Sequence, residues 1–187
     1  MADLTFVYGA MGCGKTTELM RMYENHKRRG FRPFIIKPSD DTKAQGISSR
    51  LGVEMAADLV STQDMDLIFE LHSQRIDIVL VDEAQFLTPQ QVTQLYSIAH
   101  GDRPIPVICY GLRSDFRTNS FPGSLRLFEL ADVFTEIPTL CKCGRKATFN
   151  IRYKNGVPTT IGDQVAIEGD EAVYDVMCGT CRARLML

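Results

Sequence analysis

The chain has 187 residues, of which 44% are hydrophobic, and a formal net charge of −2. This length suits one domain with a small appendage, and the nearly balanced charge provides no basic field for unspecific binding of nucleic acid. The sequence has neither a secretory signal pattern nor an apolar run near the roughly 20 residues of a membrane span, so we expect a cytoplasmic protein without membrane attachment.

The first predicted elements surround a glycine-rich loop. Residues 4–8 are rich in strand-forming side chains, and residues 17–29 are compatible with a helix that ends at Gly30. The stretch between them fits the phosphate-binding pattern G-x-x-x-x-G-K-[ST] and reads Gly9-Ala10-Met11-Gly12-Cys13-Gly14-Lys15-Thr16. Its backbone N–H groups and the start of the helix would bind phosphate, Lys15 would reach the β- and γ-phosphates, and Thr16 would hold Mg²⁺.

Strands and helices are then predicted to alternate. We expect strands at residues 34–36, 76–81, 104–110 and 133–137, and helices at residues 64–71, 88–101 and 124–131. Thr88, Pro89 and Gln91 have the pattern of a capped helix start, whereas the polar residues 37–52 are predicted to form a mobile loop. The alternation predicts an α/β fold of the P-loop NTPase type, in which helices flank a parallel sheet.

The character of the chain changes after Pro138. Cysteine pairs and short β-like runs at residues 148–153, 164–167 and 173–176 replace the alternation. We therefore predict two domains, a P-loop α/β domain over residues 1–138 and a small lid over residues 139–187.

Two acids follow the apolar run of residues 76–81. Asp82 has the position of a Walker-B acid and would bind Mg²⁺ directly or through water. Glu83 could activate water, which would make the protein an ATPase, or accept a proton from a substrate hydroxyl, which would make it a kinase. The compact core followed by a small module favours a small-molecule kinase, because phosphoryl transfer requires that water be excluded.

Aromatic side chains lie close to this site in the sequence. Phe86 follows the acids, and Phe116 and Phe121 lie in the loop after the strand of residues 104–110. Ligands of open α/β sheets bind at the carboxyl ends of the strands, so these rings could sandwich a flat base. They could equally pack in the core, and their positions alone do not distinguish the two interpretations.

Four of the six cysteines form two close pairs, Cys141 with Cys143 and Cys178 with Cys181. Four thiolates suit a structural, tetrahedral Zn²⁺ site, although the first pair is one residue tighter than is usual. The metal would fix both ends of the intervening loop, residues 148–177. The alternatives are free or redox-active thiols and a zinc ribbon that binds nucleic acid, against which the acidic run of residues 168–171 argues.

Together these motifs resemble the type II thymidine kinase family, the cytosolic, zinc-containing form, and its bacterial branch in particular. The resemblance covers nearly the whole chain. It is carried by the glycine-rich loop with the following Thr17-Glu18-Leu19-Met20, by Val81-Asp82-Glu83-Ala84-Gln85-Phe86, by Tyr110-Gly111-Leu112-Arg113-Ser114-Asp115-Phe116, and by the cysteine pairs with Gly144-Arg145-Lys146-Ala147.

The resemblance implies transfer of the γ-phosphate of ATP to the 5′-hydroxyl of thymidine, with Glu83 as the catalytic base. It implies an ATP·Mg²⁺ site formed by Gly9 to Thr16 together with Asp82, Glu83, Ala84 and Gln85. It also implies a nucleoside site formed by Phe86, Leu112, Phe116, Phe121 and Tyr174. Structural zinc at the four cysteines and a homotetramer follow from the same resemblance.

The chain departs from the family pattern in two places. The family often has Ile-Gly-Gly six residues before the substrate-side tyrosine, whereas here Ile167-Glu168-Gly169 begins seven residues before Tyr174. In Asp41-Thr42-Lys43, Lys43 stands where the family commonly has arginine, which binds phosphate bidentately as lysine does not.

Overall fold

The computed structural model describes residues 2–39, 46–49, 52–164 and 172–186. The two departures from the family pattern, at residues 41–43 and 167–169, lie outside this range. So does the strand predicted over residues 164–167, apart from Gln164, which belongs to no strand. Among the described residues no helix is long and apolar enough to cross a membrane.

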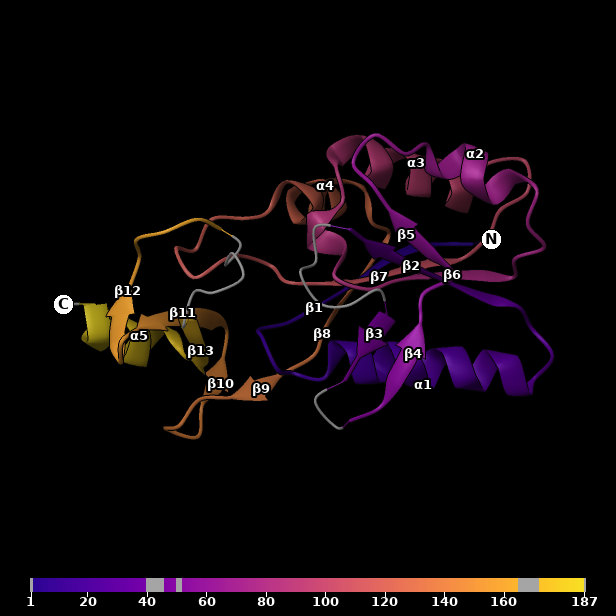
Figure 1. Ribbon diagram of the computed structural model, residues 1–187. Coiled ribbons are helices and arrows are strands. Elements are labelled where there is room, and N and C mark those ends of the chain that lie inside the picture. The colour runs from indigo at the N-terminus through magenta and orange to yellow at the C-terminus, as the bar shows by residue number, and fades with distance from the viewer. Residues whose placement is uncertain (1, 40–45, 50–51, 165–171, 187) are drawn as a thin grey trace.

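Six strands form a single sheet in the order β5-β2-β6-β7-β1-β8 (Figure 1). Every neighbouring pair in it is parallel. The strands are β1 (Leu4–Tyr8), β2 (Pro33–Pro38), β5 (Leu59–Ser61), β6 (Ile78–Val81), β7 (Val107–Gly111) and β8 (Val133–Glu136). The predicted α/β fold with a parallel sheet is confirmed, and the carboxyl ends of the central strands share one edge.

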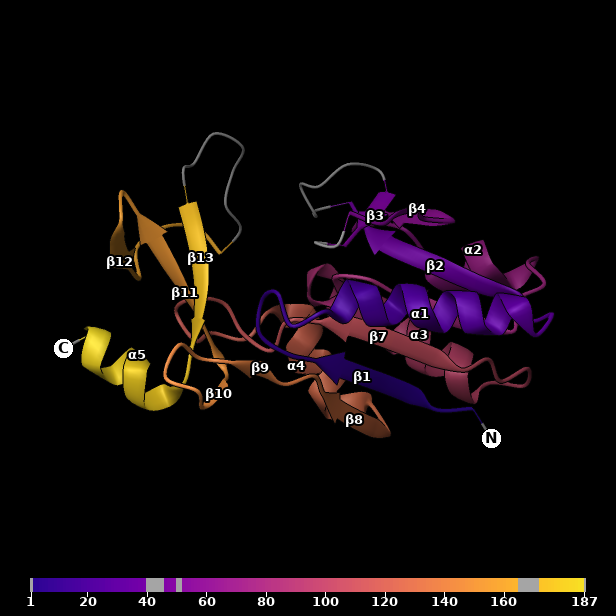
Figure 2. The same cartoon turned by 90° about the horizontal axis from the view of Figure 1, so that it is seen from below.

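Helices cover both faces of the sheet. Helix α1 (Lys15–Arg28) lies on one face, and α2 (Leu67–His72), α3 (Pro89–His100) and α4 (Pro122–Leu130) lie on the other (Figures 1 and 2). Strand β6 contributes to both layers: Val79 and Val81 pack with residues of α3, and Ile78 and Leu80 pack with residues of α1. This two-sided burial explains why β6 has an almost continuous apolar sequence.

Capping residues determine where the helices start. Thr88 and Gln91 form the predicted capping box at the start of α3. Helix α2 begins later than predicted because the Asp66 carboxylate caps it, accepting hydrogen bonds from the backbone N–H groups of Ile68 and Phe69. Helix α4 begins earlier than predicted, at Pro122, whose fixed φ suits the first helical position.

The prediction of a loop over residues 37–52 is wrong in part. Strand β2 extends to Pro38, and β3 (Gly46–Ser48) pairs antiparallel with β4 (Glu54–Ala56). Ile47 is buried in the cluster beneath α1, which explains why so short a strand is ordered. The buried Lys37 side chain donates a hydrogen bond of 2.8 Å to the Gly46 carbonyl oxygen. Residues 40–45 and 50–51 lie outside the described range.

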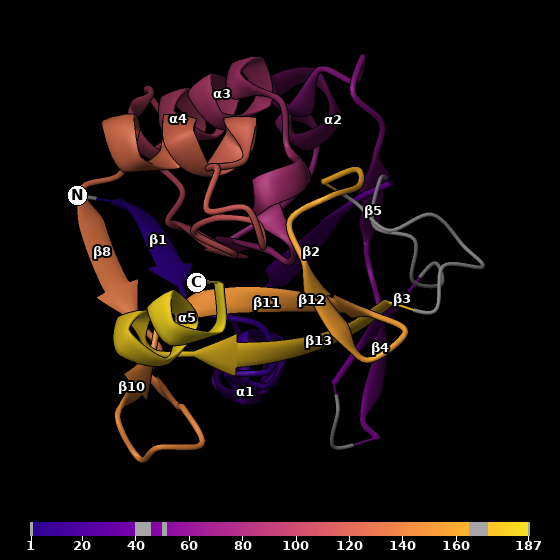
Figure 3. The same cartoon turned by 90° about the vertical axis from the view of Figure 1, so that its left-hand side faces the viewer.

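The C-terminal part of the chain is a separate small assembly beside the sheet (Figures 2 and 3). It has a hairpin of β9 (Thr139–Leu140) and β10 (Lys146–Ala147) and an antiparallel sheet in which β11 (Phe149–Lys154) lies between β12 (Val157–Thr159) and β13 (Ala172–Met177). Helix α5 (Gly179–Met186) follows. The strands predicted at residues 148–153 and 173–176 are confirmed, whereas β12 and α5 were not predicted.

Candidate active site and metal centre

The glycine-rich loop connects β1 to α1, as its motif predicts. Gly12 and Gly14 have φ values of 71° and 93°, which are left-handed conformations that favour glycine. At Gly9 the constraint is space, because a Cβ atom there would lie 2.7 Å from the Ile137 carbonyl oxygen. The loop therefore depends on its glycines to bring backbone N–H groups to the start of α1.

Lys15 and Thr16 begin α1 and point toward the carboxyl edge of the sheet. The Lys15 ammonium is nearly buried and donates to the carbonyl oxygens of Gly9 and Ala10, at 3.2 and 3.0 Å. The Thr16 hydroxyl lies 3.3 Å from both carboxylate oxygens of Asp82, at the end of β6. A hydroxyl and a carboxylate placed together are the hard oxygen ligands that suit Mg²⁺.

Glu83 directly follows Asp82 and has a left-handed backbone, with φ of 47° and ψ of 41°. This conformation costs a non-glycine residue about 1–2 kcal/mol. The Gln85 side chain, in the short 3₁₀ helix η1 (Ala84–Phe86), donates a 2.7 Å hydrogen bond to the Glu83 carboxylate. The same amide accepts a 2.9 Å hydrogen bond from the Leu112 N–H group, so it links the carboxylate to the loop after β7.

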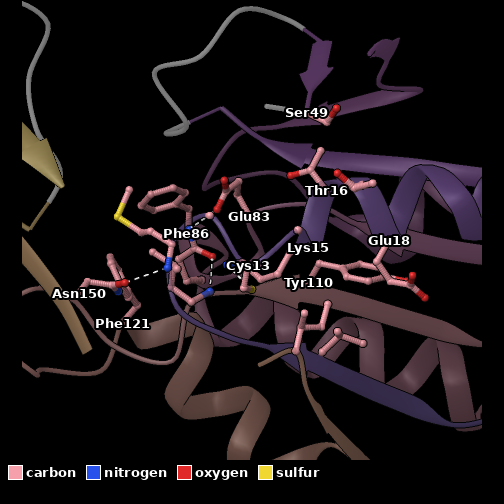
Figure 4. A pocket seen from close by; sticks show the side chains of 18 of the residues that line it. Cys13, Lys15, Thr16, Glu18, Ser49, Glu83, Phe86, Tyr110, Phe121 and Asn150 are labelled. Atoms are coloured by element: carbon pink, nitrogen blue, oxygen red, sulfur yellow. Dashed lines mark hydrogen bonds between the residues drawn. The ribbon is translucent and has the colours of Figure 1, made fainter. Parts of the chain in front are cut away.

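A cavity of about 880 Å³ connects these groups. Residues 11–14 of the glycine-rich loop (residues 9–14, called the phosphate loop below) line one part of it with Lys15 and Thr16. Glu83 lies between that part and the aromatic side chains (Figure 4). The five residues predicted to surround the nucleoside all line the cavity, namely Phe86, Leu112, Phe116, Phe121 and Tyr174.

The aromatic residues are both packed and exposed to the cavity. The rings of Phe86 and Phe121 meet edge to face, with centroids 5.7 Å apart, and those of Phe116 and Tyr174 do so at 6.5 Å. Phe116 and Phe121 are buried. The two interpretations left open by the sequence are thus compatible, because rings fixed by packing still present an apolar wall to the cavity.

Other predicted nucleotide-site residues, all within the described range, do not line this cavity. Gly9 and Ala10 face a small neighbouring recess. Asp82 and Ala84 are buried behind the cavity wall, where Asp82 reaches the site through Thr16.

Several cavity residues were not singled out from the sequence. Tyr110 packs against α1, and burial, followed by the charge of Glu18, raises the pKa of its hydroxyl. Asp115, Asn150 and Gln164 also line the cavity. Two signals were available: Tyr110 and Asp115 lie in the motif of residues 110–116 that carries the family resemblance, and Asn150 is a residue type depleted in strands within the predicted strand of residues 148–153.

The four cysteines predicted to bind metal come together at the base of the C-terminal assembly. The Sγ atoms of Cys141, Cys143, Cys178 and Cys181 all lie within 4.8 Å of one another. Cys141 and Cys143 lie in the β9–β10 hairpin, whereas Cys178 and Cys181 lie at the start of α5. Four thiol donors at this spacing fit tetrahedral Zn²⁺. All four cysteines are free thiols, so none of them is committed to a disulfide.

The thiols affect one another's ionisation. Backbone N–H groups of Cys143 and Cys178 lower the pKa of Cys141 to about 6, and that of Cys181 lowers the pKa of Cys178. Hydrogen bonds with the other three thiols raise the pKa of Cys181 to about 12. All four thiols would be deprotonated together only with a cation bound among them, which is the chemistry of a metal site.

Comparisons with known proteins agree with this geometry. The family described as thymidine kinase matches residues 2–182. The chain is 42% identical to a thymidine kinase of Legionella pneumophila, over 97% of this chain and 88% of that one. It is 44% identical to thymidine kinases of Chromobacterium violaceum, over 97% and 98% of the two chains, and of Idiomarina loihiensis, over 91% of each.

Proposed function

The chain belongs to the thymidine kinase family, and we propose that it transfers the γ-phosphate of ATP to the 5′-hydroxyl of thymidine. One observation supports this reaction above others. A carboxylate, that of Glu83, lies in a single cavity between a phosphate-binding loop and a group of aromatic side chains (Figure 4). A base in this place can accept a proton from a hydroxyl group that faces the terminal phosphate, and the aromatic side chains suit a flat nucleobase.

Glu83 is the proposed catalytic base. In this role its carboxylate accepts the 5′-hydroxyl proton as the terminal phosphate is transferred in line. Gln85 orients the carboxylate through its 2.7 Å hydrogen bond. The left-handed backbone supports a functional assignment as well, because strain of this kind is concentrated at active sites.

The nucleotide site comprises residues 9–16 together with Asp82, Glu83, Ala84 and Gln85. Backbone N–H groups and Lys15 bind the phosphates, and Thr16 and Asp82 would hold Mg²⁺, which neutralises charge on the transferred group. The Lys15 hydrogen bonds to Gly9 and Ala10 hold the ammonium within reach of this site. Phe86, Leu112, Phe116, Phe121 and Tyr174 enclose the nucleoside.

Residues 1–138 are assigned to the ATP-binding domain. Residues 139–187 are assigned to a lid that covers the active site. Zn²⁺ bound by the four cysteines would fix the hairpin and α5 to each other at the base of this lid. Tyr174 on β13 and Asn150 on β11 then reach the cavity from the lid side.

A homotetramer is also part of the proposal. β8 lies at one edge of the six-stranded sheet, and its Val133 and Phe134 side chains are 40% and 47% exposed. An apolar edge strand suits coverage by another copy of the chain. Light scattering should give four times the 21.0 kDa mass of the chain.

The deciding experiment measures ATP consumption with and without thymidine, in the native protein and in Glu83→Gln. We expect consumption to depend on thymidine, and the variant to lose about 10²–10⁴-fold in kcat because an amide cannot accept the proton. ATP affinity should be unchanged, since Gln at position 83 can still accept the hydrogen bond from Gln85. Glu129→Gln, on the outer surface of α4, is the matched control.

Two results would contradict the proposal. Consumption of ATP without nucleoside would instead indicate an ATPase that drives a partner. Full turnover by Glu83→Gln would exclude Glu83 as the base.

A further inference from the structure

Asn150 lies where the lid and the phosphate loop meet the loop of residues 112–121 after β7, here called the nucleoside loop. It is on β11, the central strand of the C-terminal sheet, and it is 4% exposed. Its side-chain oxygen accepts a 2.8 Å hydrogen bond from the Met11 N–H group, 139 residues away (Figure 4). Its side-chain nitrogen donates a 3.0 Å hydrogen bond to the Ser114 carbonyl oxygen.

These two hydrogen bonds join loops with different tasks. Met11 belongs to the phosphate loop, and its N–H group is engaged by Asn150. Ser114 belongs to the loop after β7 that carries Phe116 and Phe121. A carboxamide can donate and accept at the same time, whereas a carboxylate only accepts. The side chain therefore matches one backbone donor and one backbone acceptor.

The nucleoside loop is internally braced, so a contact at one point positions the whole loop. The buried Asp115 carboxylate accepts hydrogen bonds from the N–H groups of Arg117 and Asn119, at 2.9 and 2.8 Å. Gln164, also from the lid, donates to the same carboxylate at 3.3 Å. A β-bridge between Ser114 and Ser120 closes the loop.

The phosphate loop is braced too. Lys15 donates to the Gly9 and Ala10 carbonyl oxygens, and the Glu18 N–H group donates to the Gly14 carbonyl oxygen at 2.9 Å. Asn150 thus connects two units that are each held by their own contacts. Loss of its side chain should alter their relative position more than their individual structures.

We propose that Asn150 is a positioning residue that sets the distance between the phosphate donor and the nucleoside acceptor. The inference rests on the proposed kinase function. Phosphoryl transfer is sensitive to this distance, because a misplacement of 1 Å can reduce the rate by about 100-fold. The lid would accordingly contribute to the rate by aligning the two substrates, in addition to covering the site.

The test uses Asn150→Ala, which removes both hydrogen bonds, and Asn150→Asp, which has the same shape but loses the donor to Ser114. We expect kcat to fall about 10–100-fold in Asn150→Ala and at least as far in Asn150→Asp, whose carboxylate would face the Ser114 carbonyl oxygen. The Kd of ATP for Asn150→Ala, measured without nucleoside, should change less than about threefold, because the phosphate loop retains its own contacts. Asn155→Gly is the control, since Asn155 is exposed at the far end of the lid with φ of 52°.

Thymidine and deoxyuridine, which differ by one methyl group, are both assayed as acceptors. A positioning role predicts the same loss of kcat for both nucleosides, whereas an altered ratio between them would show that Asn150 instead contacts the base. A lowered Tm with unchanged kcat would reduce Asn150 to a structural role, and a large loss of ATP affinity would restrict it to the phosphate loop; each of these overturns the inference.

The thymidine kinase activity of the native protein distinguishes failure of this inference from failure of the proposed function. If native protein does not phosphorylate thymidine, the proposed function fails. If the native protein is active and both variants are as active as the native protein, only the positioning role fails. Should Asn150→Ala not fold, Asn150→Asp decides.

Discussion

The central sheet and the C-terminal assembly, the proposed lid, differ in how much apolar surface they bury. All four residues of β6 are buried on both faces of the sheet, with exposed fractions of 0–3%. In the lid, large apolar side chains remain exposed, among them Leu140, Ile161 and Val173, and its small buried cluster is built around Cys141, Ala147 and Cys178. We therefore expect burial of apolar surface to stabilise the sheet, and the C-terminal assembly to depend on a metal bound by its four thiols.

The largest expected effect is therefore loss of the metal. Cys178→Ser, or a strong chelator, should remove Zn²⁺ and open the lid, since zinc binding contributes about 10–16 kcal/mol to the folding of zinc-finger peptides. Hydrogen exchange should increase in β11 and β13 and remain slow in β6 and β7. Metal analysis of the native protein should find one Zn²⁺ per chain.

Thr180→Ala is the control for this experiment. Thr180 lies between the two ligands Cys178 and Cys181, and its hydroxyl accepts a hydrogen bond from Arg145 on the exposed surface. Two results would contradict the distinction between the two regions. One is a native protein that contains no zinc, and the other is a chelator that increases hydrogen exchange equally in the lid and in the sheet.

An intermediate effect is expected from truncation in the sheet. Leu80→Ala should lower the free energy of unfolding by about 2–5 kcal/mol, because Leu80 is fully buried and its loss leaves a cavity. Ile161→Ala in the lid should change it by less than about 0.5 kcal/mol, because that side chain is 83% exposed. Urea denaturation measures both, and similar costs for the two variants would contradict the comparison.

A local contact in the sheet domain should have a smaller effect than the loss of Leu80. Thr88→Ala should cost about 1 kcal/mol, because the hydroxyl accepts a 3.1 Å hydrogen bond from the Gln91 N–H group at the start of α3. Thr88→Ser retains the hydroxyl and should restore most of this stability. A thermal melt compares the variants, and a loss in Thr88→Ser equal to that in Thr88→Ala would show that the cap is unimportant.

The sequence allowed prediction where the determining contacts are local. The glycine-rich loop, the apolar strand β6 and the capping box of Thr88 and Gln91 each depend on residues a few positions apart, and the structure has all three. The cysteine pairs were equally recognisable, because their spacing is itself the signal of a metal site.

The features that escaped prediction depend on contacts between distant segments. The β3–β4 hairpin is stabilised by burial of Ile47 under α1, which no local pattern indicates. Asn150 disfavours a strand by its intrinsic propensity, and its partners Met11 and Ser114 are 139 and 36 residues away. The composition of the cavity wall therefore required the structure, although its aromatic members were already candidates.

The left-handed backbone of Glu83 has a consequence for attempts to stabilise this protein. Glycine would adopt φ of 47° without strain, so a chain under selection for folding alone would gain by discarding the carboxylate at this position. Glutamate at this position of the chain therefore costs backbone stability. Catalytic activity and thermal stability thus favour different residues at position 83. Variants of this protein selected only for thermal stability would tend to lose the carboxylate and with it the activity.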